Sequence, residues 1–306
     1  SALAPEIEML KEKHEQAEKL PGVILPDDII FTTDLKEAIE GKGMLVLAVP
    51  SPFTRSTAKA MSPFVAKGQL IVSVAKGIEE NTLMTLSEII MEEIPQCEVA
   101  VLCGPSHAEE VGKEIPTSLV AGAKKRATAE LVQNTFMSEV LRVYTSPDVL
   151  GMEIGASLKN VIALAAGMAD GLGYGDNTKA ALITRGISEM GRLALAMGAK
   201  YETLSGLTGM GDLIVTCASK HSRNRRAGYL MGQGYTMQQA MDEVKMVVEG
   251  VYSAKAAIAL AKKYHVDMPI IEQVNEVLFE DKPAKEAVKE LMLRDKKVEH
   301  DDLEWQ

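Results

Sequence analysis

Cysteines and unbroken apolar runs are scarce in this sequence, and each scarcity excludes a class of protein. Only three cysteines occur, Cys97, Cys103 and Cys217, and their spacing fits neither a metal motif nor a set of disulfides. No stretch has the roughly 18 consecutive apolar residues of a membrane span, and the first ten residues lack the basic start and apolar core of a signal peptide. We therefore expect a cytoplasmic protein with reduced thiols, no metal and no membrane partner.

Positive charge is also in short supply. The chain has 33 Lys and Arg against 43 Asp and Glu, a formal net charge of -10, which disfavours nucleic acid as a partner. An anionic ligand would therefore need a local cationic pocket. The composition is otherwise that of a globular protein, 46% hydrophobic and 25% charged, and 306 residues suffice for two domains.

Short apolar segments alternate with helical stretches in the first half of the chain, as they do in βα units. We expect strands at six places: 29–33, 44–49, 70–75, 98–102, 118–121 and 141–145. The run 45–49 is apolar on both faces, which is typical of strands buried in a parallel sheet between helical layers. The first half is therefore predicted to be an α/β domain.

The alternation stops at about Pro147. Beyond it the sequence has helical periods and no convincing strand, for example over residues 177–198 and 222–230. We therefore predict an α/β domain over residues 1–147 followed by an all-helical domain over residues 148–306. The highly charged stretch 293–306 is expected to form a surface helix or a frayed tail.

Three of the expected strands run into segments that contain chemically useful residues: 49–53, 76–79 and 103–109. In doubly wound sheets, ligands bind beyond the carboxyl ends of the strands, which is where these segments begin. One such segment alone is more consistent with a plain turn, whereas three at the same edge favour a site. His107 is the only one of the five histidines in these segments, and no metal site is expected.

Lys159 lies in an apolar helical stretch. The residues three and four positions away are all small or apolar: Gly155, Ala156, Ile162 and Ala163. Lys159 is therefore expected on a face that packs. Burial lowers the pKa of an ammonium group, which allows it to exchange a proton with a substrate oxygen. A lysine that extends along the helix to pair with a carboxylate explains the pattern equally well.

The densest cluster of positive charge is the segment SRNRR, residues 222–226, in which Ser222 is suited to cap a helix. Free backbone N–H groups, a cap hydroxyl and a guanidinium at a helix N-terminus form a phosphate site. A solvated helix start with salt bridges is an equally supported alternative. Upstream, the glycine-rich segment 206–212 ends in Asp212, which would either orient Lys159 or cap the following helix.

Together, these segments closely resemble the bacterial NAD(P)-dependent sn-glycerol-3-phosphate dehydrogenase family. The resemblance runs in order from Ser1 to about Leu293 through LPGVILP, AVPS, AKGIE, GPSHAEEV, GASLKNVIALAAGMADGLGYGDNTKAALITRG, GLTGMGDLIVTC, SRNRR and VVEGVYSAK. It implies an enzyme that uses NAD or NADP to interconvert dihydroxyacetone phosphate and sn-glycerol 3-phosphate for glycerophospholipid synthesis. It also implies a Rossmann-like dinucleotide-binding domain, a helical substrate domain and a homodimer.

The resemblance assigns roles to individual residues. Lys159 matches the catalytic proton donor and acceptor, and Asn160, Asp212 and Thr216 match its polar surroundings. The substrate-contacting positions correspond to Lys76, Gly104, Ser106, Lys159, Asp212, Ser222, Arg223 and Asn224. The cofactor-contacting positions correspond to Lys76, Ala108, Arg223, Val247 and Glu249.

One feature of the family is missing. Its members begin with a strand, a glycine-rich turn and a second strand, and no G-x-G-x-x-G occurs here. We therefore expect a fragment that lacks about 30 residues, comparable with one βαβ unit, and has impaired cofactor binding. The absence of this unit should also leave unpaired apolar strand edges, along residues 45–47 or at Leu70.

Two alternatives remain open at this point. One is another two-domain dehydrogenase of the superfamily, of the 3-hydroxyacyl-CoA or 6-phosphogluconate type. The other is a non-catalytic module that binds a phosphate-bearing metabolite or a partner chain. The SRNRR cluster and the stretch around Lys159 weigh against the first alternative.

Overall fold

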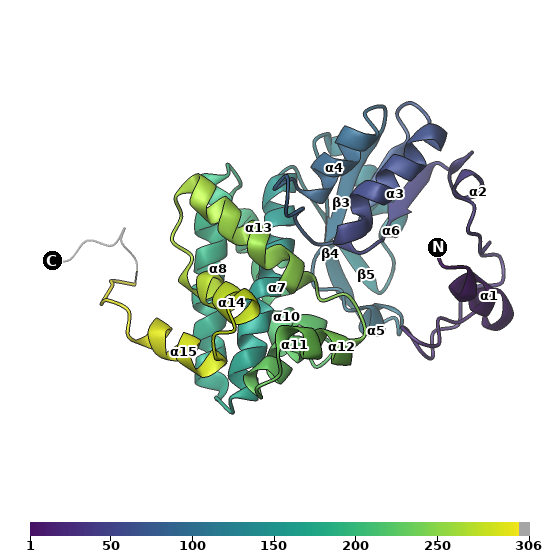
Figure 1. The fold of residues 1–306 in the computed structure, drawn as a ribbon. Coiled ribbons are helices and arrows are strands. Elements are labelled where there is room, and N and C mark those ends of the chain that lie inside the picture. The colour runs from purple at the N-terminus through teal and green to yellow at the C-terminus, as the bar shows by residue number, and fades with distance from the viewer. Residues whose placement is uncertain (300–306) are drawn as a thin grey trace.

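The computed structural model describes residues 1–299, and an α/β half is followed by a helical half (Figure 1). The described part contains one sheet with the strand order β1-β2-β3-β4-β5. Its strands are β1 (Met44–Leu47), β2 (Leu70–Ser73), β3 (Glu98–Cys103), β4 (Thr117–Ala123) and β5 (Leu141–Ser146). Five of the six expected strands are therefore present.

The strands do not all run in the same direction. β1, β2 and β3 are parallel, β4 is antiparallel to β3, and β5 is parallel to β4. The alternation of strands and helices indicated βα units, whose strands are parallel, and β4 is the exception. The connection from β3 to β4 contains only the one-turn helix α5 (Ala108–Val111), which is too short to return the chain along the length of β3. The carboxyl ends of β1, β2 and β3 nevertheless meet at one edge.

The strand expected at residues 29–33 is absent, and Ile29 and Ile30 are exposed in an irregular segment. An apolar run forms a strand only where a neighbouring strand can pair with it, and β1 pairs with β2 alone. An unpaired edge along residues 45–47 is thus present, whereas β2, which contains Leu70, is paired on both sides. Val46 is half exposed, so the expectation that this run is buried on both faces was also wrong.

Helices cover the two faces of the sheet. The α/β half contains α1 (Ala4–Lys13), α2 (Leu35–Ile39), α3 (Thr54–Met61), α4 (Leu86–Glu93) and α6 (Arg126–Phe136), besides α5. Buried residues of α2, α3 and α4 pack with Leu45, Leu47 and Ile71 of β1 and β2. On the other face, α6 packs against β3, β4 and β5, which explains why Val46 of β1 is left uncovered there.

The second half of the described chain is helical. Its helices are α7 (Val149–Gly171), α8 (Asp176–Ala196), α9 (Tyr201–Leu204), α10 (Asp212–Ala218), α11 (Arg223–Gly232), α12 (Met237–Val244), α13 (Glu249–Tyr264), α14 (Pro269–Phe279) and α15 (Ala284–Met292). A π-helical turn, Leu207–Gly211, leads into α10. The change from strands to helices falls between Ser146 and Val149. The division into domains at residue 147 agrees with this change and stays a prediction.

The charged C-terminal stretch 293–306 was expected to form a surface helix or a frayed tail, and the structure describes residues 293–299 of it. Helix α15 ends at Met292, and residues 293–299 form no helix. A surface helix is therefore not found there. Residues 300–306 lie outside the described part of the chain.

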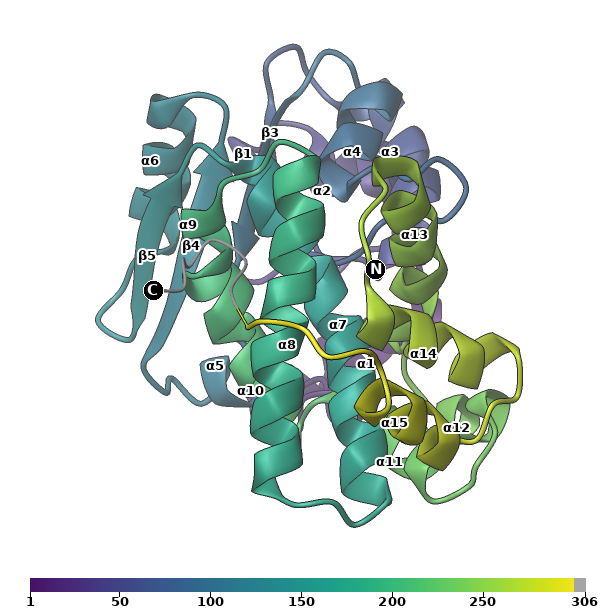
Figure 2. The ribbon, with the colours of Figure 1, turned by 90° about the vertical axis from the view of Figure 1, so that its left-hand side faces the viewer.

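Helix α7 is the centre of the helical half and packs against α8, α10, α11 and α13 (Figure 2). It is long and apolar enough to cross a membrane, but 89% of its most apolar window is buried inside the molecule. We therefore interpret α7 as a core helix.

The crossing of α7 with α11 is very close, since a Cβ atom added to Gly228 would lie 2.1 Å from the carbonyl oxygen of Leu164. Glycine is required where two backbones approach in this way.

Two glutamates of the helical half bind serines of the α/β half. Glu153 on α7 accepts hydrogen bonds from the Ser87 N–H at 2.9 Å and from Ser87 Oγ at 2.5 Å. Glu249, the first residue of α13, accepts from the Ser51 N–H at 3.0 Å and from Ser51 Oγ. Burial raises the pKa of both carboxyl groups, although the serine hydrogen bonds oppose the rise.

Candidate active site

Asp212 binds two lysines from different halves of the molecule. Its Oδ1 is 2.7 Å from Nζ of Lys159 on α7, and its Oδ2 is 2.7 Å from Nζ of Lys76, which follows β2. Lys159 Nζ also donates to Thr216 Oγ1 at 2.6 Å, and Lys76 Nζ donates to the carbonyl oxygen of Gly104 at 2.9 Å. Of the two roles considered for Asp212, the structure shows contact with Lys159, and its side chain makes no cap hydrogen bond to α10.

The three charged groups are largely shielded from water. Lys159 is 5% exposed and Asp212 1% exposed. Burial lowers the pKa of Lys159 from the ordinary 10.5 to about 8, although Asp212 opposes the fall. Burial also lowers the pKa of Lys76, but the Asp212 carboxylate outweighs this and holds that pKa above its usual value. Burial raises the pKa of Asp212, yet the two ammonium groups bring it below its usual value.

These charges give the site a definite electrostatic character. With both lysines protonated, two positive charges face one carboxylate, so the cluster carries a net positive charge. Such a cluster stabilises an oxyanion that develops beside Lys159. A lysine with a pKa near 8 is also present in both protonation states close to neutral pH, which suits a group that donates and accepts protons.

The three arginines of SRNRR, at the N-terminus of α11, have different surroundings. Arg225 Nε donates to Asp170 Oδ2 at 2.7 Å, and the exposed Arg226 lies 3.7 Å from Glu243. Arg223 is exposed and forms no ion pair with any residue in 1–299. The salt-bridge interpretation therefore fits Arg225 and Arg226, whereas Arg223 is available for a ligand.

The backbone at this helix start is also suited to an anion. The Ser222 hydroxyl oxygen accepts from the N–H of Arg225 at 3.2 Å, as the predicted cap requires. The N–H groups of Arg223 and Asn224 come before the first hydrogen bond of the helix and point out of its end. The Asn224 side chain is already used, since its Oδ1 accepts from the Gly250 N–H at 2.8 Å. Its backbone N–H is therefore the group free to bind a ligand.

The remaining predicted residues lie at the carboxyl edge of the sheet or close to it. Ser106 follows β3 and donates from Oγ to the Gly104 carbonyl at 3.1 Å, and Ala108 begins α5. Glu249 reaches the same edge through Ser51, which follows β1. Val247 is half-buried two residues before Glu249. The structure thus brings Glu249 close to the segment that follows β2, since a Cβ atom added to Gly77, the neighbour of Lys76, would lie 3.5 Å from Glu249 Oε2.

Ser51 is the residue that the sequence did not identify. It lay in a segment expected to be near a site, but its partner Glu249 is 198 positions away. No local sequence pattern connects the two, so only the tertiary structure reveals the contact. Adding a Cβ atom to Gly77 would place it 2.4 Å from Ser51 Cβ, so glycine is needed beside this contact.

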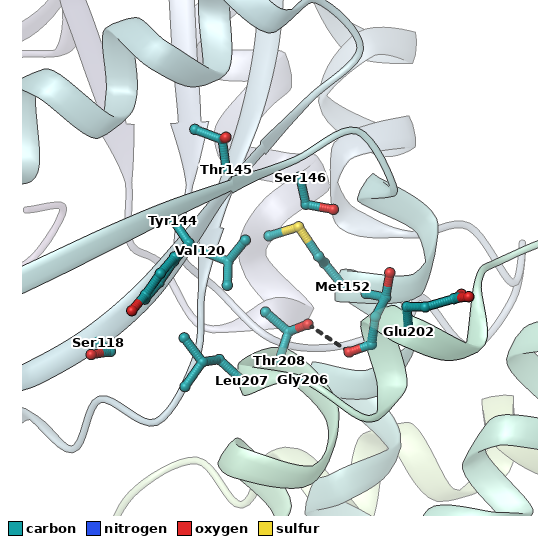
Figure 3. Close-up of a pocket in the computed structure, with 11 residues that line it drawn as sticks. Ser118, Val120, Tyr144, Thr145, Ser146, Met152, Glu202, Gly206, Leu207 and Thr208 are labelled. Carbon is teal, nitrogen blue, oxygen red and sulfur yellow. Dashed lines mark hydrogen bonds between the residues drawn. The ribbon is translucent and has the colours of Figure 1, made fainter.

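A separate cavity of about 480 Å³ lies between β4, β5 and the segment around α9 (Figure 3). Tyr144, Met152 and Thr208 are among its lining residues, and none of the predicted site residues lines it. It borders the π-helical turn that precedes Asp212. The polar cluster around Asp212 and this cavity are therefore different places.

Comparison with known proteins places this geometry in a family. The model of the NAD-dependent glycerol-3-phosphate dehydrogenase N-terminus matches residues 2–129, and that of the C-terminus matches residues 148–289. A glycerol-3-phosphate dehydrogenase (NAD(P)+) from Agathobacter rectalis is 73% identical over 305 residues, which cover 100% of this chain and 91% of that protein. This chain belongs to the NAD(P)-dependent glycerol-3-phosphate dehydrogenase family.

More distant relatives of the family agree. The glycerol-3-phosphate dehydrogenase (NAD(P)+) of Bacillus subtilis is 50% identical over 300 residues and covers 97% of this chain and 87% of its own length. The crystal structure of the Coxiella burnetii glycerol-3-phosphate dehydrogenase superposes with a TM-score of 0.93 at 34% identity, covering 96% of this chain and 90% of that chain.

These matches confirm the predicted family, the fold class, the glycerol-3-phosphate dehydrogenase activity and the use of NAD(P). They give no support to the expectation of a fragment with impaired cofactor binding. They also favour this family over the two alternatives, another dehydrogenase of the superfamily and a non-catalytic module. The roles of the individual site residues, the homodimer and the cytoplasmic location stay predictions.

Proposed function

We propose that this glycerol-3-phosphate dehydrogenase interconverts dihydroxyacetone phosphate and sn-glycerol 3-phosphate at the cluster formed by Lys159, Asp212 and Lys76. The observation that carries this proposal is the buried Lys159 ammonium, held 2.7 Å from Asp212 and joined through α7 to the anion-binding start of α11. A proton donor and a phosphate anchor are the two groups that a phosphorylated ketone requires. Both are present on packed helices.

The residues at the carboxyl edge of the sheet fit the nicotinamide end of NAD(P). Glu249, placed by Ser51, offers carboxylate oxygens to ribose hydroxyl groups, as an acidic residue does in dinucleotide-binding folds. When bound there, the cofactor supplies or accepts the hydride. Lys76, Ala108, Arg223 and Val247 are the further residues that we propose to contact it.

Lys159 performs the acid–base step. During reduction the carbonyl oxygen gains negative charge, and the Lys159 ammonium stabilises this charge more in the transition state than in the ground state before it donates its proton. In the reverse direction, neutral Lys159 accepts the proton of the alcohol. Asp212 and Thr216 hold Nζ in place throughout, and Asn160 fixes the adjacent turn of α7.

The start of α11 holds the phosphate. Arg223 supplies a guanidinium, and the N–H groups of Arg223 and Asn224, with the Ser222 cap, supply the helix N-terminus. Gly104 and Ser106 border the substrate on the side of the sheet. Binding the phosphate orients the reacting carbon toward Lys159, so this remote interaction contributes to turnover as well as to affinity.

The resemblance also supports a homodimer and a cytoplasmic location for glycerophospholipid synthesis. Light scattering of the purified protein tests the homodimer.

The central test of the proposed function is oxidation of NADH or NADPH in the presence of dihydroxyacetone phosphate. Absence of turnover with both cofactors would contradict the proposed function.

A further inference from the structure

Glu153 is a buried carboxylate on the helix of Lys159 that the proposed reaction does not use. It is 5% exposed, and both of its oxygens accept hydrogen bonds from one residue of the other half of the chain, Ser87. The backbone N–H of Ser87 donates to Oε1 at 2.9 Å, and Ser87 Oγ donates to Oε2 at 2.5 Å. Ser87 is itself buried, in the first turn of α4. Breaking either bond would leave a buried carboxylate short of a donor, so the pair holds together tightly.

Ser87 lies at the end of a segment that begins with Lys76. After Lys76 the chain turns back on itself, because Ile78 forms an antiparallel bridge with Thr85, the cap residue of α4. Ile78 comes two positions after Lys76, and Thr85 two positions before Ser87. The bridge therefore ties the two ends of the segment to each other. A displacement of Ser87 moves Lys76 as well.

The apolar contacts of this segment do not fix its position by themselves. Ile78 is 3% exposed and belongs to the same apolar cluster as Ile154 and Leu158 of α7, the neighbours in sequence of Glu153 and Lys159. Hydrophobic packing has no preferred direction, and packed side chains can slide. Hydrogen bonds have a narrow range of distance and angle. The pair of bonds to Glu153 thus sets the position of the segment relative to α7.

The position of this segment matters because of the carboxylate that the two lysines share. Nζ of Lys159 and Nζ of Lys76 each lie 2.7 Å from an oxygen of Asp212. Lys159 and Asp212 belong to α7 and α10, which pack against each other. Lys76 is the member of the cluster that the α/β half supplies. Its place in the cluster therefore depends on how that half is held against α7.

We propose that Glu153 is a positioning residue for the reaction: by binding Ser87, it holds the segment that carries Lys76 where Lys76 and Lys159 share Asp212. The inference rests on the proposed function and adds a residue that touches neither substrate nor cofactor. Lys76 is the only one of the proposed cofactor contacts that lies on this segment. Loss of the Ser87 contact should therefore lower turnover more than it weakens cofactor binding.

Glu153→Leu tests this directly, because it removes both acceptors and keeps a side chain of similar size. With dihydroxyacetone phosphate and a saturating concentration of the cofactor that the wild-type protein uses, we expect kcat to fall by at least about tenfold. The reason is that a misplacement of about 1 Å at the reacting groups can cost about 100-fold. The Kd of the cofactor, from a fluorescence titration, should change by less than about threefold, since the distant contact of Glu249 with Ser51 stays intact.

Three further variants and one control assign the effect to this contact. Glu153→Gln can accept from the Ser87 N–H and donate to Ser87 Oγ, so its kcat should stay within about threefold of the wild type. Ser87→Ala removes one of the two bonds and should lower kcat less than Glu153→Leu does. The double variant should be no slower than Glu153→Leu alone, because both changes break one contact. As a control, Lys255→Ala removes an exposed ion pair with Glu80 of the same segment and should leave kcat unchanged.

The outcomes separate this inference from the proposed function. A wild-type protein without turnover contradicts the function itself. Normal kcat in a folded Glu153→Leu variant leaves the function in place and overturns the role of Glu153. Equal losses of kcat and cofactor affinity also overturn it, because they indicate a general structural effect. If melting curves show that Glu153→Leu does not fold, Ser87→Ala decides, and wild-type kcat in that variant overturns the inference.

Discussion

The side-chain amide of Asn224 donates a hydrogen bond to Oδ1 of Asn160 at 2.9 Å. Asn160 follows Lys159 on α7, and Asn224 is the second residue of α11, so this bond joins the turn that carries the lysine to the start of the helix proposed to bind phosphate. Further along the same pair of helices, Gly228 brings the backbones into contact. The separation between Lys159 and the start of α11, the proposed proton donor and phosphate anchor, is therefore set by helix packing and not by loops.

Replacing Lys159 tests the acid–base role directly. We expect Lys159→Ala to lower kcat by at least about 100-fold with a smaller effect on cofactor affinity, because general acid catalysis contributes about 10² to 10⁴. Steady-state kinetics and titration of NADH fluorescence measure the two effects. Lys255→Ala, which removes a half-exposed lysine beside Glu80, is the matched control. A near-normal kcat would make Lys159 an ordinary buried lysine.

The pH dependence should have opposite signs in the two directions. Reduction needs protonated Lys159, so its rate falls as the pH rises through about 8, the lowered pKa of this group. Oxidation of sn-glycerol 3-phosphate needs neutral Lys159, so its rate rises through the same pH. Measuring kcat in both directions across this range checks the assignment. Rates that change in the same direction, or a transition near the ordinary 10.5, would contradict it.

Asp212→Asn should shift this transition to lower pH. The Asp212 carboxylate raises the pKa of Lys159, so its removal lets burial and the charge of Lys76 lower that pKa further. Thr216→Val is the matched variant, because it removes a hydrogen bond to Lys159 without removing a charge. Melting curves show whether each variant is folded. If folded Asp212→Asn keeps the wild-type transition, Asp212 does not tune Lys159.

Arg223 and Arg226 should differ sharply in their effect on the substrate. Arg223→Ala is expected to raise KM for dihydroxyacetone phosphate by about 10- to 150-fold, because a charged hydrogen bond to phosphate is worth about 1.5 to 3 kcal/mol. Arg226→Ala should have little effect, since within residues 1–299 Arg226 pairs only with exposed Glu243. Unphosphorylated dihydroxyacetone is the control substrate. Equal losses on both substrates would indicate a structural role for Arg223.

The sequence predicts the parts of this protein that depend on local pattern. Apolar, β-branched runs located β1 to β5, and the small neighbours of Lys159 predicted its burial. The same pattern does not distinguish parallel from antiparallel strands, so the direction of β4 was missed. It also failed at residues 29–33, where the apolar run has no strand to pair with.

Contacts between distant residues could not be predicted in this way. Asp212 meets Lys76 across 136 positions, and Ser51 meets Glu249 across 198. Each pair comes together only when the two halves pack, so neither residue type nor sequence spacing predicts the contact. The resemblance to a family supplied the candidate residues, whereas the sharing of the Asp212 carboxylate by Lys159 and Lys76 is visible only in the three-dimensional structure.

The hydrogen bond from Ser87 to Glu153 also bears on how the chain folds. Ser87 lies in the first turn of α4, so the α/β half obtains an acceptor for one of its helix N-termini from α7 of the other half. Separation would expose that N–H and would also uncover the Glu153 side of α7. The buried Ser87 and Glu153 are paired with each other across the two halves, which links the stabilities of the halves. We expect the protein to unfold in one cooperative transition, and either half expressed alone to lack the protection from hydrogen exchange that the whole chain gives it.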